Sequence, residues 1–171
     1  LVEQVQICSK FMIKHLPGFQ NATISGLAPR LGVRETRRVL GDEILSGDDV
    51  FHARKRDDGV AKGSHHIDIH QEGAGQIRIA VENGGSYDIP FSSLIPKGLS
   101  NTMVAGRCFS ADRRANGSAR TMGPCLAMGQ AVGLAAVYAA NTNATPDVRA
   151  IDFKGFRRKL QEQGAILEGT H

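Results

Sequence analysis

The stretch that organises this chain is residues 101–140. It begins with Asn-Thr-Met-Val-Ala-Gly-Arg-Cys-Phe-Ser (101–110) and, after a connection rich in Gly and Arg, continues with Gly-Pro-Cys-Leu-Ala-Met-Gly-Gln-Ala-Val-Gly-Leu-Ala-Ala (123–136). Residues 102–105 form a short apolar run that Gly106 ends, which predicts a buried strand. Residues 124–140 predict a helix with Pro in its first turn. The chain therefore crosses from a strand to a helix, with glycines at both joints.

The predicted helix is unusually rich in small residues, which stand at 127, 129, 131, 133, 135 and 136. Because Gly inside a helix costs about 1 kcal/mol relative to Ala, such a helix is expected to approach something closely. Two partners fit: a neighbouring sheet or helix, or a ligand lying across the helix N-terminus. The first backbone N–H groups of a helix and its dipole attract anions.

Runs 101–111 and 117–133 resemble the C-terminal, flavin-contacting segment of FAD-dependent oxidoreductases with the two-dinucleotide-binding fold, most closely the largely uncharacterised bacterial ones. Residues 31–41 (Leu-Gly-Val-Arg-Glu-Thr-Arg-Arg-Val-Leu-Gly) and 87–98 (Tyr-Asp-Ile-Pro-Phe-Ser-Ser-Leu-Ile-Pro-Lys-Gly) resemble the same group, in the same order. The resemblance implies FAD as cofactor and hydride transfer between flavin and a small organic substrate. The alternative function is a binding or interaction domain without flavin.

The family's N-terminal strand–turn–helix, with the Gly-x-Gly-x-x-Gly fingerprint that holds the FAD pyrophosphate, does not occur in these residues. The chain is therefore expected to be the C-terminal part of a longer flavoprotein, and inactive when isolated. The expected fold is α+β: the strand–helix portion of an FAD-binding α/β domain plus a small β-rich cap. Four parts are predicted: 1–42, a helical segment and Arg-rich connection; 43–97, the β-rich substrate or cap domain; 98–145, the FAD-contacting strand and helix; 146–171, a final helix and tail.

The resemblance also implies which residues contact the flavin. Gly106 lets the backbone approach the cofactor, Arg107 stands where related flavoproteins carry an acid, and the run from Gly117 leads past the isoalloxazine ring to the helix start. The full predicted set is Gly106, Arg107, Gly117, Ser118, Arg120, Met122, Gly123 and Cys125. Arg107 could instead be structural and pair with Asp112 or Glu35, and Cys125 is read as a small packing residue rather than a redox thiol.

Three substrate-side candidates are Arg34, His70 and Tyr87, with no assigned proton role. Arg34 belongs to an Arg-rich run, residues 34–38, that could equally form an Arg–Glu network, and Tyr87 could equally be a core residue. His70 ends an alternating run that places His66, Asp68 and His70 on one strand face. A metal there lacks a fourth ligand, so a polar sheet face is the preferred interpretation.

Periodicity predicts the remaining elements. Residues 1–16 read as a helix ended by Pro17-Gly18, residues 42–50 lead into a short helix, and residues 54–63 read as charged and exposed. A hairpin is predicted over 64–81 and a final amphipathic helix over 151–164.

Composition limits the partners. The net charge of +4 is scattered without a long basic run, which argues against nucleic acid, and three Cys residues without a Cys-x-x-Cys pair support neither a disulfide framework nor a zinc site. No apolar run of membrane-helix length is apparent, so no membrane partner and, by default, a cytoplasmic location are expected. A homo-oligomer remains open.

Overall fold

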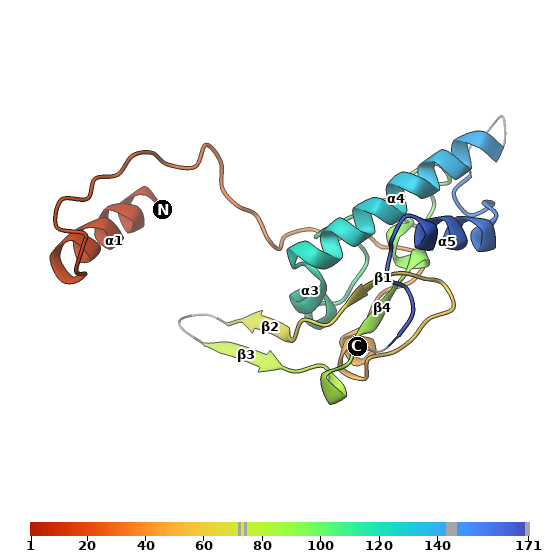
Figure 1. Ribbon diagram of the computed structural model, residues 1–171, viewed down its shortest axis with the longest axis horizontal. Coiled ribbons are helices and arrows are strands. Elements are labelled where there is room, and N and C mark those ends of the chain that lie inside the picture. Colours follow the sequence, from red (N-terminus) through yellow and green to blue (C-terminus); the bar gives the residue numbers. More distant parts are fainter. Residues whose placement is uncertain (72, 74, 143–146, 170–171) are drawn as a thin grey trace. The chain divides into compact units, whose positions relative to one another are not determined.

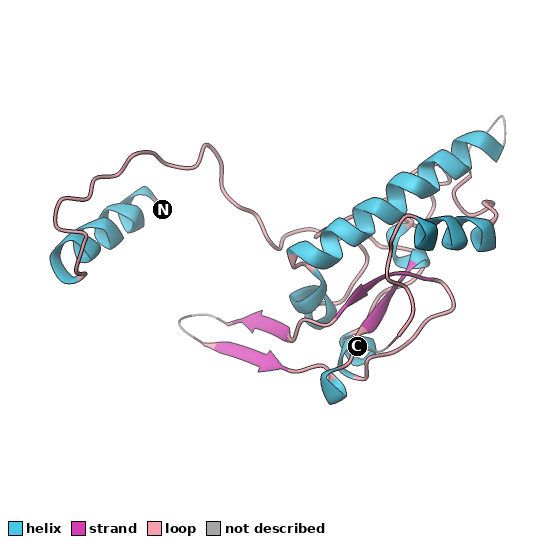
Figure 2. Cartoon of the chain, viewed as in Figure 1, coloured by secondary structure: helices cyan, strands magenta, loops and turns pink. Residues whose placement is uncertain are grey.

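The computed structural model describes residues 1–71, 73, 75–142 and 147–169. The chain forms two compact units, Leu1–Val33 and Arg34–His171. Figure 1 colours both along the sequence, and Figure 2 separates their helices, strands and loops. The predicted boundary between parts 98–145 and 146–171 falls outside the described residues.

The first unit consists of helix α1 (Val2–His15) and an irregular segment after it. The helix ends where predicted, because Leu16 is extended and Gly18 adopts a positive φ of 90°. None of the residues in α1 is buried. The unit therefore presents its apolar side chains, among them Val2, Ile7 and Phe11, to its surroundings.

The second unit contains two antiparallel pairs of strands. Strand β1 (Gly59–Gly63) pairs with β4 (Tyr87–Pro90), and β2 (Ile67–His70) pairs with β3 (Gln76–Ile79) as the predicted hairpin. The prediction that residues 54–63 are exposed is wrong for β1, of which four of the five residues are buried. Helix α4 contacts β1, and Gly59 and Gly63 leave room for Asp88 and Tyr87 of β4, which hydropathy alone does not reveal.

Alternation along β2 follows the prediction. Ile67 is buried and Ile69 packs against the core, whereas His66, Asp68 and His70 are half-buried or exposed. On the paired strand β3, Ile79 lies opposite Ile67 and Ile77 lies opposite Ile69. The predicted polar face of this strand is confirmed.

Among its described residues the second unit has four α-helices, α2 (Gly47–Phe51), α3 (Arg113–Ala119), α4 (Met122–Thr142) and α5 (Phe153–Glu162), and two short 3-10 helices, η1 (Glu82–Gly84) and η2 (Phe91–Leu94). Three of the α-helices were predicted, with α4 beginning two residues before Pro124. In Figure 1, α4 runs beside α5 and above the β1–β4 pair; contacts join α4 to β1 and to α5. The largest fully buried side chains of the core include Tyr87, Phe109, Phe156, Met128 and Leu160.

One local expectation was wrong, and one helix was not predicted. Residues 102–105 are not a strand: only Val104 N–H bonds to a neighbouring segment, at Leu94 O, 2.8 Å away. The Gly/Arg-rich connection, for which no element was predicted, contains α3, which begins because the Asp112 side chain accepts the Ala115 N–H at 2.7 Å. The described elements nevertheless make up an α+β fold, as predicted.

Helix α4 also departs from the expectation that no segment has membrane-helix length. Residues Met122–Asn141 are long and apolar enough to cross a membrane, with a mean hydropathy of 1.3. Core helices of soluble proteins meet the same criterion, so this single helix is weak support for a membrane segment.

Candidate functional site

The turn at residues 106–109 lies against the beginning of α4. Gly106 has a φ of 85°, and Phe109 N–H closes the turn on Gly106 O at 3.2 Å. A Cβ placed on Gly106 would have only Cys125 Sγ for a neighbour, at 4.0 Å. Phe109 is fully buried and anchors the turn, which leaves Arg107 and Cys108 exposed.

Helix α3 holds this turn in place through a residue that sequence reasoning missed. Asn116 is fully buried, and its Nδ2 donates to Arg107 O at 3.1 Å. A buried Asn inside a helix usually serves a specific hydrogen bond, because its amide is costly to bury without one. The sequence could have pointed to Asn116 only if its burial had been predicted. That burial cannot be predicted without knowing that residues 113–119 form a helix.

The first turn of α4 is open on one side. Met122 is 74% exposed, and a Cβ on Gly123 would meet nothing within 4 Å. The first N–H groups of a helix lack intrahelical acceptors and carry the positive end of its dipole. The exposed Gly106–Arg107 turn and the open start of α4 together form a surface, here called the turn–helix surface, that suits an anionic or electron-rich ligand.

Cys125 lies beside this surface but points toward the end of α3. Its Sγ is 3.5 Å from Arg120 O and 3.9 Å from Ala119 O. Burial raises the pKa of its thiol, while the positive charge of Arg107 acts in the opposite direction. A thiol with a raised pKa stays protonated at neutral pH, which agrees with a packing role.

Ser118 and Tyr87, both predicted near the site, meet in the core. Tyr87 is fully buried, and its hydroxyl lies 2.7 Å from Ser118 Oγ, which in turn donates to His65 O. Burial raises the pKa of Tyr87 far above its usual value. Of the two interpretations left open for Tyr87, the core role is the one that the structure shows.

Arg120 and Gly117 face the β2–β3 hairpin. The Arg120 guanidinium is 8% exposed and donates to Glu35 Oε2 at 2.9 Å and to Asp68 O at 3.1 Å. Glu35 also accepts from Arg38 at 3.0 Å. The Arg–Glu network that was the alternative prediction for residues 34–38 therefore exists: Glu35 binds both Arg38 and the buried Arg120. Contact of Gly117, Ser118 and Arg120 with a cofactor stays a prediction.

The remaining substrate-side candidates do not form one cluster with Tyr87 in the described part of the chain. Arg34 is exposed. His70 is exposed at the end of β2, with Nε2 3.5 Å from Asp68 Oδ2. Asp68 also accepts from Gln76 at 2.6 Å, and this bond, followed by the charge of His70, lowers the pKa of the Asp68 carboxyl.

His66 differs from its neighbours on the same strand face. Its ring stacks on His65 with the centroids 4.0 Å apart, and burial lowers its pKa, so it is neutral at pH 7. Within the described ranges, no group of three or more His, Cys, Asp or Glu side chains is arranged to hold a metal ion.

Comparison with known proteins places the chain in a family. The family model described as FAD dependent oxidoreductase matches residues 2–160, whereas no curated protein and no solved structure gives a match. The family match spans both units and includes the turn at 106–109 and the start of α4. This chain therefore belongs to the FAD dependent oxidoreductase family, whose cofactor is FAD.

Proposed function

We propose that the turn–helix surface is where this chain contacts FAD, and that the protein transfers hydride between a small organic substrate and the flavin. The observation that carries the proposal is the open space at two glycines: a Cβ on Gly123 would meet nothing within 4 Å, and one on Gly106 would meet only Cys125 Sγ, at 4.0 Å. A side chain at either position would occupy the space in which a flat ring can approach backbone. Bound FAD supplies the redox chemistry, and the chain supplies orientation and charge.

Each residue of the surface has a distinct task in this proposal. The Gly106 backbone allows close approach, and Asn116 keeps the turn pressed on α3 by its bond to Arg107 O. The N–H groups at the start of α4 favour negative charge next to them. The Arg107 guanidinium adds a positive charge beside the same helix start, where it also acts on Cys125.

We further propose that the pyrophosphate of FAD is held elsewhere. Residues 1–171 contain no Gly-x-Gly-x-x-Gly sequence, and the fingerprint strand–turn–helix of the two-dinucleotide-binding fold is expected outside them. This division predicts that the turn–helix surface orients the ring system while other residues supply most of the affinity.

The test uses the protein made from the complete reading frame. Wild type, Arg107→Ala and the matched control Arg158→Ala, an exposed arginine on α5, are purified, and the flavin-to-protein ratio is read from the absorbance spectrum. Arg107→Ala should retain less flavin or turn over more slowly, and Arg158→Ala should behave as wild type. Wild-type retention and turnover in Arg107→Ala would remove the assignment.

The second candidate function, an interaction domain without flavin, is favoured by another face of α4. Leu126 and Val137 are 75% and 54% exposed, and a Cβ added to Gly129 or Gly133 would have nothing within 4 Å. A protein from the complete reading frame that contains no flavin, and takes up none when FAD is added, would support this candidate.

A further inference from the structure

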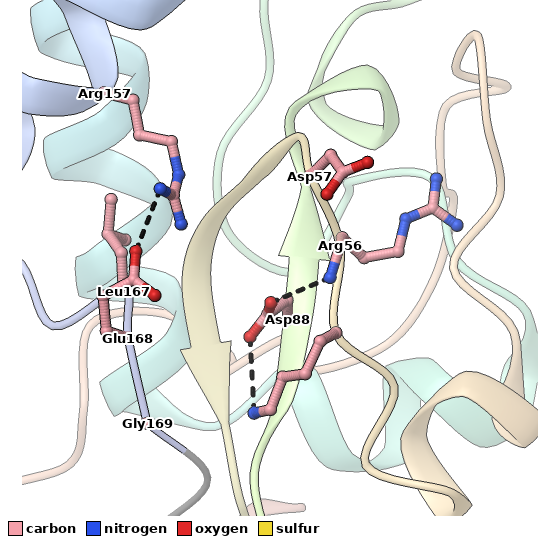
Figure 3. A pocket seen from close by; sticks show the side chains of 8 residues that line it. Arg56, Asp57, Asp88, Arg157, Leu167, Glu168 and Gly169 are labelled. Carbon is pink, nitrogen blue, oxygen red and sulfur yellow. Dashed lines mark hydrogen bonds and ion pairs between the residues drawn. The ribbon is translucent and has the colours of Figure 1, made fainter.

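A charged cleft of about 390 Å³ lies away from all residues predicted to contact FAD. Three segments line it: the loop before β1, strand β4, and the C-terminal segment with α5 beside it. Figure 3 shows Arg157 and Glu168 on one side of the cleft and Asp88 and Arg56 on the other. Clefts of this size hold small organic ligands, which typically need about 300 Å³ or more.

Asp88 carries an unmet hydrogen-bonding requirement at this cleft. It is 5% exposed, and its Oδ2 accepts the Arg56 N–H at 3.0 Å. Its Oδ1 is buried and has no hydrogen-bond partner in the described part of the chain. Lys55 forms an ion pair with this oxygen at 3.6 Å, longer than a hydrogen bond, and its ammonium donates to Ser86 Oγ at 3.1 Å and to Ser86 O. A buried carboxylate oxygen without a donor costs free energy, so this atom favours a ligand that brings one.

The opposite wall offers a hydrogen-bond donor for an acid group. Arg157 donates from Nε to Gly59 O at 3.2 Å and from Nη1 to Glu168 Oε1 at 3.0 Å. Its Nη2 has no acceptor among the residues that the structure describes. A guanidinium held by two bonds, with one nitrogen unoccupied, is a preorganised partner for a carboxylate.

The C-terminal segment is held as a wall of the cleft, although residues 165–171 read as a loose tail in the sequence. Lys62, the cross-strand neighbour of Asp88, donates to the carbonyl oxygens of Glu168, at 2.8 Å, and of Gly169. Leu167 is 5% exposed and inserts beside them. These contacts give the cleft a defined shape up to residue 169.

The six charged side chains that line the cleft balance one another, and the ammonium of Lys62, held by Glu168 O and Gly169 O, adds one positive charge beside them. Lys55, Arg56 and Arg157 are cationic, and Asp57, Asp88 and Glu168 are anionic. A phosphate would be repelled by the carboxylates of the cleft, and a metal ion would be repelled by its Lys and Arg side chains. A ligand with zero net charge, but with a positive and a negative group, can be attracted by both sets. We propose that the cleft binds a small zwitterion, an α-amino acid, whose ammonium group donates to Asp88 Oδ1 and whose carboxylate accepts from Arg157. The proposal does not depend on the flavin assignment.

The test is a titration of the complete chain followed by backbone amide NMR, with no FAD present. L-alanine is the probe, and acetate and ethylammonium each carry only one of its two charges. L-alanine should shift the amide signals of residues 55–57, 88 and 167–169 and saturate with a Kd of about 1 mM or tighter. Acetate and ethylammonium should bind about tenfold or more weakly, because each loses a charge-assisted hydrogen bond.

Two variants and a control sharpen the result. Asp88→Asn removes the negative charge with little change of shape, and Arg157→Gln changes a more exposed side chain that the fold tolerates more readily. Either should weaken L-alanine binding about tenfold or more, whereas Arg158→Gln, next to Arg157 but outside the cleft, should leave it unchanged. Absence of saturation by about 50 mM L-alanine, or equal binding of acetate, would overturn the proposal.

Discussion

Asp42 and Arg149 form a paired contact that joins distant parts of the second unit. Arg149 Nε and Nη2 donate to the two carboxylate oxygens at 2.7 and 3.0 Å, and Nη2 also donates to Pro96 O at 3.1 Å. The hydrogen bond from Arg149 is the main cause of a lowered pKa at Asp42, ahead of the opposing effect of burial. Two-point geometry makes this pair more specific than an ordinary surface ion pair.

This pair predicts a pH-dependent loss of stability. A carboxyl whose pKa is lowered by folding stabilises the fold above its unfolded pKa, about 3.9, and loses that contribution as the pH falls through the lower folded pKa. Asp42→Asn should therefore cost about 0.5–1 kcal/mol at pH 7 and much less near pH 2. Urea unfolding at both pH values measures the difference, with Asp57→Asn as the control. An equal loss at both pH values would contradict the assignment.

Tyr87 supplies a second prediction at the same scale. Tyr87→Phe removes the hydroxyl that bonds to Ser118 Oγ, while Ser118 keeps His65 O as its acceptor. The expected cost is about 1 kcal/mol of unfolding free energy, with turnover of the flavin-loaded enzyme unchanged. A large fall in turnover without loss of stability would instead place Tyr87 at the substrate.

Among the elements, α3 and α4 use glycine for different reasons. A Cβ on Gly117 in α3 would lie 2.8 Å from Asp68 O, so at Gly117 the backbone of α3 closely approaches the backbone of β2. The close approach predicted for α4 is not made at Gly129 or Gly133 by any described residue, since nothing lies within 4 Å of their Cβ positions. Any partner of that α4 face lies outside the described part of the chain.

Matched substitutions test this contrast. Gly129→Ala and Gly133→Ala should each raise the unfolding free energy of the 171-residue chain by up to about 1 kcal/mol, because Ala favours helix and no clash follows. Gly117→Ala should lower it by about 1–3 kcal/mol, because the backbone of Asp68 cannot give way cheaply. Thermal or urea unfolding distinguishes the two signs. A stabilising Gly117→Ala would show that α3 and β2 are not in close contact.

For the whole molecule, the hydrophobic core lies in the second unit. The most N-terminal member of the hydrophobic core is Leu45, and α1 contributes no buried residue. Deleting residues 1–33 should therefore change the Tm of the chain by less than about 4 °C, which corresponds to less than about 1 kcal/mol. A drop of about 10 °C or more would show that Leu1–Val33 stabilises the remainder.

Local patterns were enough to predict several parts of the fold. The helix at the start, the 64–81 hairpin with its alternating faces, α4 with Pro124 in its first turn and α5 all follow from periodicity and from Pro or Gly punctuation, which act over a few residues. The family also followed from short runs, because Gly106, Arg107 and the glycine-rich helix stand in a recognisable order.

Other features needed the tertiary structure, since they depend on residues that are far apart in the chain. Strand β1 is buried because α4 covers it, the 102–105 segment stays irregular because only Val104 bonds to a neighbouring segment, and Tyr87 is a core residue because Ser118 and Gly63 surround it. The sequence by itself thus determined the helices other than α3, the hairpin and the flavin-dependent family. Only the tertiary structure decided which polar groups are buried together, as with Asp88 at its cleft, because burial is a property of the packed chain and not of any local run.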